Sequence, residues 1–281
     1  MTKVQINCPS CSKVGYIEIS LNVIKDSLRG LLAINIAKDI VCPHSFIAYI
    51  DKNLNVRDYF VADFQIELPQ MTPEEIRKVD KIPSKDIVDI DLIKLNIPAM
   101  LLTYILKSIF LKQKIVIIQD QEFLHNHIHN FFKYITQNSF ETEIILVTEE
   151  TYNNNKKTYK DSMVFDNINI LRNVKKFINP KKLSIEKHFV SRFVSEGDLG
   201  YSYIVLKNDI LKSFEFSKAI INFINESKEK NEKTNTLKIS TQLEELYDYK
   251  INTIYLNFLI EIVKHYFGVA VPSITDSFLG I

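Results

Sequence analysis

The chain has 281 residues, of which 46% are hydrophobic and 25% charged, so it is long enough to bury a sizeable core. Its formal net charge of +1 argues against a general nucleic-acid coat but leaves a local basic patch open. No secretory signal opens the sequence, and its most apolar stretches (97–111 and 254–263) contain Lys107 and Glu261 and resemble buried helices. We therefore expect no transmembrane segment and a cytoplasmic location.

Residues 1–68 contain short runs in which apolar and polar side chains alternate, the pattern of half-buried strands. Strands are expected over 16–20, 46–50 and 59–68. The polar run 51–55 contains Asp and Asn, which suit a hairpin turn. The sequence therefore predicts a small β-rich N-terminal domain over residues 1–68.

A proline-containing connector with one short helix is expected over residues 69–90. Within it, Thr72, Pro73 and Glu75 form a helix start, with threonine as N-cap, proline at the first helical position and glutamate three residues after the cap.

From residue 91 to residue 281 the pattern changes to helices that alternate with short apolar strands, which favours an α/β domain with parallel strands and a helical C-terminus. The predicted helices are 98–112, 122–136, 213–225 and 251–267. The predicted strands are 114–119, 143–148, 162–165, 168–171 and 201–206. Residues 152–157 are predicted to form a loop, 196–200 a turn, and the charged run 226–235 a linker or exposed helix end.

The three cysteines all lie in the first 42 residues, an odd number that favours a metal over a disulfide. Cys8 and Cys11 are separated by two residues, which lets two thiolates converge on one tetrahedral ion. In the extended pair Cys42 and His44, positions i and i+2 project to the same side. We predict that these four residues bind one structural zinc ion. The alternative is that the cysteines only pack and His44 is incidental.

The knuckle Cys8-Pro9-Ser10-Cys11 followed by Gly15 resembles zinc-ribbon and related zinc β-modules. This resemblance implies a structural metal and a surface for contacts with protein or nucleic acid. Residues 1–70 contain seven basic and seven acidic residues, so the module lacks the positive charge expected for phosphate binding.

Only six glycines occur, and their positions allow neither of the two glycine-rich nucleotide-binding loops, nor a nucleophile elbow. One alternative is a metal-dependent enzyme that uses Asp120, His125 and His129. Asp120 follows a predicted strand, and the two histidines are four residues apart on one helix face. The pattern lacks the glutamate of a His-Glu-x-x-His motif, and the apolar residues of this helix define a different face. Surface histidines are therefore the favoured interpretation.

Residues 156–192 contain ten basic and three acidic residues, which we call the basic band. Such a band suits an acidic protein, a lipid headgroup or nucleic acid, and a solvated face is the commoner explanation. Its candidate partner-binding residues are Lys175, Lys176, Lys181 and Lys182. A nucleic-acid-associated factor that uses this band is the second alternative function, and a protein partner is expected over nucleic acid.

The apolar helix ending at Gln113, the strand 114–118, the next helix and the strand 144–147 together resemble the central part of DENN-type domains. The resemblance covers residues 91–148 and implies regulation of a small GTPase. A zinc module in place of the longin-like N-terminal part departs from that family's arrangement. The expected function is a non-enzymatic cytoplasmic adaptor or regulator that binds another protein.

Overall fold

The computed structural model describes residues 2–20, 31–61, 82–232 and 234–271. The N-terminal strands form two antiparallel sheets. Strands β1 (Thr2–Asn7) and β2 (Val14–Ile19) pair in one sheet, and β3 (Leu31–Ile36), β4 (Phe46–Asp51) and β5 (Val56–Phe60) form the other in that order. The predicted helix start at 72–75 and the strand residues after 61 lie outside the described residues.

The expected hairpin turn after β4 is present, because the side chain of Asp51 accepts hydrogen bonds from the backbone N–H groups of Asn53 and Asn55, both at 2.8 Å. The alternation of apolar and polar residues decides which side chains of β1 are buried: Val4 and Ile6 are buried, and their neighbours in the sequence are exposed. Together with Phe46, Ala48 and Ile50 they belong to a small core that includes Cys8 and Cys42. We call residues 2–20 and 31–61 the metal module.

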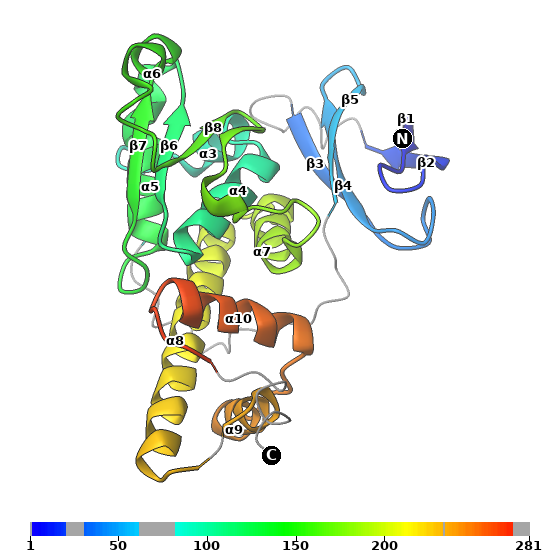
Figure 1. The fold of residues 1–281 in the computed structure, drawn as a ribbon. Coiled ribbons are helices and arrows are strands. Elements are labelled where there is room, and N and C mark those ends of the chain that lie inside the picture. The colour runs from blue at the N-terminus through cyan, green and yellow to red at the C-terminus, as the bar shows by residue number, and fades with distance from the viewer. Residues whose placement is uncertain (1, 21–30, 62–81, 233, 272–281) are drawn as a thin grey trace.

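Strand β4 contributes to two cores, because Ile47 points away from the small core and joins the larger core together with Phe60 of β5. Strand β3 contacts helix α7 (Ser184–Ser195). In Figure 1 the metal module, drawn in blue, lies to one side of α7, and the four-stranded sheet described next lies to the other. The metal module is thus packed directly onto the helical part of the molecule.

The third sheet has the order β7-β6-β8-β9, in which β6 pairs in parallel with both β7 and β8, and β9 is antiparallel to β8. Its strands are β6 (Lys114–Ile118), β7 (Glu143–Val147), β8 (Met163–Asp166) and β9 (Asn169–Arg172). The intervening helices are η1 (Glu122–Leu124), α5 (His125–Ile135) and α6 (Glu149–Asn155). The parallel α/β layer and the mixed α+β class predicted from the sequence are confirmed.

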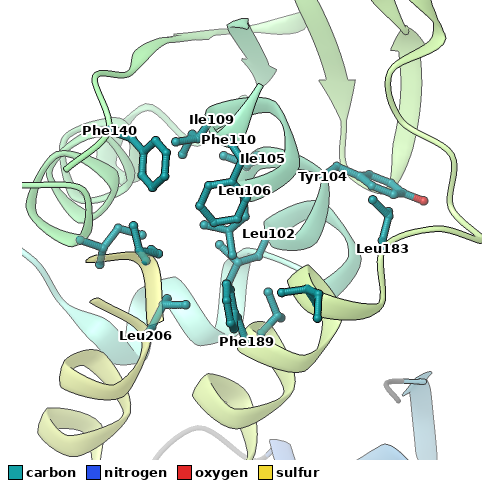
Figure 2. Close-up of a cluster of buried hydrophobic side chains, with 14 of the residues drawn as sticks. Leu102, Tyr104, Ile105, Leu106, Ile109, Phe110, Phe140, Leu183, Phe189 and Leu206 are labelled. Carbon is teal, nitrogen blue, oxygen red and sulfur yellow. The ribbon is translucent and has the colours of Figure 1, made fainter. Parts of the chain in front are cut away.

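The other described helices are α3 (Ile90–Asn96), α4 (Ala99–Phe110), η2 (Val174–Lys176), α8 (Leu199–Glu229), α9 (Thr236–Tyr247) and α10 (Thr253–His265), in addition to α7. Helix α4 is buried on nearly every face, as its apolar composition predicts. The ring of Phe110 lies 5.1 Å from that of Phe140 and 6.3 Å from that of Phe189, measured between centroids, and Figure 2 shows these rings beside Leu106.

None of the described helices is by itself long and apolar enough to cross a bilayer. Only α3 and α4 taken together reach that length and hydrophobicity, and they are bent by 105° at the break between them.

The predicted strand 201–206 is wrong, because these residues form the first turns of the 31-residue helix α8. Its start is fixed by Asp198, whose side chain accepts a hydrogen bond from the backbone N–H of Tyr201 at 2.7 Å. Residues 152–155, predicted as a loop, belong to α6, which Thr148 caps through the N–H of Thr151. The charged run that starts at Glu226 forms the end of α8 as far as Glu229.

Candidate metal centre

Two loops of the metal module bring the predicted metal-binding residues together. Cys8 and Cys11 lie in the connection between β1 and β2, and Cys42 and His44 lie in the connection between β3 and β4. One ligand atom from each of the four residues lies within 4.8 Å of every other. The first pair of residues is far from the second pair in the sequence. The four ligand atoms therefore come together because the two sheets pack against each other.

The first loop folds as a knuckle around the sulfur of Cys8. The N–H of Ser12 donates to the carbonyl of Cys8 at 2.8 Å, and the N–H of Ser10 donates to its Sγ at 3.4 Å. Ser12 adopts a positive φ of 60°, which turns the chain back toward β2. Backbone N–H groups aimed at a sulfur stabilise a thiolate, the form that binds metals.

The second loop repeats this arrangement around Cys42. The N–H of His44 donates to Sγ of Cys42 at 3.4 Å, and the N–H of Asp39 donates to its carbonyl at 2.8 Å. Asp39 also has a positive φ, of 70°. Both buried cysteines therefore receive a backbone hydrogen bond at sulfur from the residue two positions later.

The distances from His44 to the two buried sulfurs match those of a tetrahedral site. Nδ1 of His44 lies 3.5 Å from Sγ of Cys42 and 3.8 Å from Sγ of Cys8. A tetrahedral ion with bonds of about 2.3 Å to sulfur and about 2.0 Å to nitrogen places such atoms about 3.5 Å apart. The four residues thus fit one metal ion with all coordination positions filled by protein atoms.

The cluster lies at the edge of the small core, with Cys8 and Cys42 buried and Cys11 and His44 exposed. Burial opposes ionisation of Cys8, but hydrogen bonds from the backbone of Cys11 and the Cys42 thiol outweigh it and lower the pKa to about 7. For Cys42 burial dominates and raises the pKa to about 11. Neighbouring buried thiolates need a cation to share their charge, so the donor set is suited to a metal ion.

Two contacts join the knuckle hairpin to the β3-β4-β5 sheet. Gly15 packs against Val41, the residue before Cys42. The N–H of Asn7 donates to the hydroxyl of Tyr59 at 2.9 Å, and the Tyr59 ring packs edge-on against Phe46. Sequence reasoning noted Gly15 only as part of a zinc-ribbon pattern and missed Tyr59, because no local motif marks a residue that acts across two sheets.

Comparison of the chain with protein-family models and with curated proteins found no match. Four protein ligands leave no open coordination position for water or substrate, which is the arrangement of structural rather than catalytic metal sites.

Asp120, His125 and His129 do not form a metal-binding group. Among the described residues, the cluster in the metal module is the one group of three or more potential metal ligands that lie close together. Asp120 accepts a hydrogen bond from the N–H of Glu149 at 2.8 Å and lines a cavity of about 470 Å³ at the carboxyl ends of β6 and β8. Nε2 of His125 contacts the carbonyl oxygen of Gln119 at 2.6 Å.

The four candidate lysines of the basic band are all exposed, but they occupy two different settings. Lys175 and Lys176 lie on η2, where both have positive φ angles of 51° and 54°. Lys181 and Lys182 lie just before α7 and line a cavity next to α10. The two pairs can therefore be tested separately.

Proposed function

We propose that the metal module binds one structural zinc ion through Cys8, Cys11, Cys42 and His44. Three cysteines and one histidine are a common ligand set of structural zinc, and soft thiolate ligands disfavour magnesium and calcium. The ion holds together two small sheets whose shared core contains few large side chains. The expected role of the metal is therefore to stabilise the module.

We further propose that the chain is a non-enzymatic adaptor or regulator that binds another protein in the cytoplasm. The observation that supports this function is the set of large apolar side chains that the metal module leaves exposed: Val14 is 49% exposed, Tyr16 63% and Ile40 55%. Tyr16 and Val14 lie on β2, directly after the knuckle. A rigid, metal-held surface with an exposed aromatic residue is suited to protein contacts.

A small GTPase is the partner class that we propose to test first. The order helix, strand, helix and strand, on which the sequence resemblance to DENN-type domains depends, corresponds to α4, β6, α5 and β7. The basic band then supplies a positive surface that would speed association with an acidic partner.

The test is affinity capture from the native cell with the full chain, followed by identification of bound protein and RNA. One variant changes Tyr16 to Ser, and a second changes Lys175, Lys176, Lys181 and Lys182 to Glu. The matched control changes four lysines elsewhere on the surface to Glu: Lys218, Lys228, Lys230 and Lys250. The proposal expects the Tyr16→Ser variant to lose the protein partner and the band variant to bind it more slowly, while the control binds normally.

Three outcomes would contradict the proposal or one part of it. Tight, salt-sensitive binding of unselected RNA or DNA that disappears in the band variant would identify a nucleic-acid-associated factor. Full retention of the partner by the Tyr16→Ser variant would show that the metal module is not part of the interface. Capture of a protein that is not a GTPase would reject the GTPase assignment alone.

A further inference from the structure

The four-stranded sheet carries opposite charges at its two ends. The residues that directly follow β6 and β7, together with the last residue of β8, include five acidic side chains and no lysine or arginine: Asp120, Glu122, Glu149, Glu150 and Asp166. Three of these residues line the same cavity, so the carboxyl ends of the parallel strands form one acidic end. The opposite end of the sheet is basic.

Two segments meet at this opposite end. Strand β9 is antiparallel to β8, and Arg172 is the register partner of Val164, so the end of β9 lies beside the start of β8. The guanidinium of Arg172 donates a hydrogen bond of 3.2 Å to the carbonyl of Lys160, in the connection that leads from α6 to β8. We call residues 156–162 and 171–176 the basic end. It holds one acidic residue, Asp161, against six basic residues: Lys156, Lys157, Lys160, Arg172, Lys175 and Lys176.

The charge of the basic end is not neutralised by its surroundings. Lys160, Lys175 and Lys176 are exposed, and none of them forms an ion pair with another residue that the structure describes. The neighbouring Lys114 at the start of β6 is paired with Glu143 at 2.9 Å, so those two charges cancel. A surplus of positive charge therefore faces solvent at this end of the sheet.

The loop that presents Lys175 and Lys176 is closed by its own hydrogen bonds. The side chain of Asn173 accepts from the N–H of Ile178 at 3.0 Å and donates to the carbonyl of Ile178 at 2.8 Å. The N–H of Val174 contacts Sδ of Met163 at 3.2 Å, which ties the loop to β8. Because the backbone is already held in place, docking through these lysines costs less ordering entropy than docking through a free tail.

The apolar residues of the basic end favour a lipid surface over nucleic acid. Leu171 lies on β9 between the basic residues and is 50% exposed, as suits a side chain that enters the interfacial layer of a bilayer. Bases of single-stranded nucleic acid stack on exposed aromatic rings. The aromatic residue of the basic end, Tyr159, is half-buried and already stacks on Tyr152, with 6.0 Å between ring centroids.

We propose that the basic end docks on an anionic lipid bilayer, with its lysines at the headgroups and Leu171 in the interfacial layer. The acidic end lies roughly 15 Å away, since strands of four or five residues rise about 3.3 Å per residue. This distance exceeds the Debye length of about 8 Å at physiological salt, so the acidic end repels the bilayer weakly and faces away from it. The surface goes beyond the proposed adaptor function and is tested on the purified chain, so its failure would leave the adaptor proposal standing.

The experiment is co-sedimentation of the full chain with phosphatidylcholine vesicles, with and without phosphatidylserine. The chain should sediment only with the vesicles that contain phosphatidylserine. Raising the salt from about 0.1 M to about 0.5 M should weaken this binding by at least about tenfold, because the Debye length shortens. No binding to phosphatidylserine, or equal binding to phosphatidylcholine alone, would overturn the proposal.

Two triple variants with the same net charge locate the surface. Changing Lys160, Lys175 and Lys176 to Glu should weaken vesicle binding by about a hundredfold, because each basic residue near an anionic surface contributes about fivefold. The matched control changes Lys228, Lys230 and Lys250 to Glu, outside the basic end, and should stay within about threefold of the wild type. An equal loss in the two variants would show attraction by net charge alone and would overturn the docking surface.

Leu171 and a competitor RNA distinguish a bilayer from a polyanion. Leu171→Ser should weaken vesicle binding by about fivefold, while Leu171→Met should stay within about twofold, because the methionine side chain is still apolar. An unchanged affinity of Leu171→Ser would overturn the insertion of this side chain. Excess unselected RNA should not displace the chain from the vesicles. Displacement, together with direct salt-sensitive RNA binding, would assign the basic end to nucleic acid and overturn the proposal.

Discussion

Gly15 of strand β2 and Val41, in the connection between β3 and β4, are in direct contact. They lie so close that a Cβ atom on residue 15 would be 2.9 Å from Cγ2 of Val41 and 3.0 Å from Cγ1. Gly15 lies in β2 after the knuckle, and Val41 precedes Cys42. The contact therefore helps to fix the position of one ligand pair relative to the other.

Changing Gly15 to Ala should destabilise the metal module by about 1–3 kcal/mol, the usual cost of overpacking a tight contact. The reason is that Val41 is a short, branched side chain with little freedom to move. Denaturant unfolding and the rate of zinc loss to a chelator measure the effect. Gly197→Ala is the control, because nothing lies within 4 Å of its added Cβ atom. Equal behaviour of the two variants would show that the contact is unimportant.

His127 should contribute to stability rather than to chemistry. Its Nδ1 accepts a hydrogen bond of 3.2 Å from the N–H of Asp89, a residue only 7% exposed that caps α3. His127→Ala should cost about 1–3 kcal/mol, because a largely buried donor loses its partner. His129, which is exposed, should change stability by less than about 0.5 kcal/mol when replaced by Ala. Thermal and urea unfolding distinguish these results, and a neutral His127→Ala variant would contradict this role.

The double variant His125→Gln and His129→Gln tests the enzyme alternative. Since the described structure does not gather these side chains with Asp120, metal content should be unchanged. Elemental analysis of the variant and the wild type side by side provides the measurement. Loss of a second metal equivalent in the variant would restore the metal-dependent enzyme as the leading hypothesis.

The ligands and most of the α/β layer follow from local sequence features. The spacing of Cys8 and Cys11, and of Cys42 and His44, limits how the side chains can point, and the short apolar strands around β6 are bounded by clear turns. Helix α8 was not predicted at its start, because the aromatic and branched residues after Gly200 locally resemble a strand. Its helical periodicity is visible only over a longer window, where Leu206, Ile210, Ile220 and Ile224 are buried.

Features that depend on tertiary packing could not be predicted from the sequence. Helices α7 and α9 were not predicted, and neither was the ion pair between Lys107 and Glu186. Lys107 interrupts an apolar helix, and its partners come from α7 and α10, which are distant in sequence. No local pattern shows that a charge will meet its partner in this way.

Asp209 should make the stability of the helical region dependent on pH. Burial raises its pKa from 3.8 to about 7, against the opposing charges of Arg192 and Lys212. Arg192 Nη1 donates to both carboxylate oxygens at 2.9 and 3.1 Å. Between about pH 4 and pH 7 the folded protein keeps this proton while the unfolded chain has lost it, so the free energy of unfolding falls as pH rises. The slope contributed is at most about 1.4 kcal/mol per pH unit.

The Asp209→Asn variant removes that titration. Urea unfolding across the same pH window should show a shallower decline for the variant than for the wild type, with the difference growing toward neutral pH. Identical pH profiles for the two proteins would show that Asp209 is ionised throughout the window, because the charge of Arg192 would then lower its pKa more than burial raises it.

The central claim is that Cys8, Cys11, Cys42 and His44 hold one zinc ion that stabilises the metal module. The most direct measurement is elemental analysis of the wild type and of Cys42→Ser, both purified without added metal. Limited proteolysis of the two full-length proteins then shows whether cleavage occurs within residues 1–61. We predict one zinc per chain for the wild type, and for Cys42→Ser a loss of zinc together with cleavage in the metal module. A wild-type chain that contains no metal and resists proteolysis, or a Cys42→Ser variant that keeps its zinc, would contradict the claim.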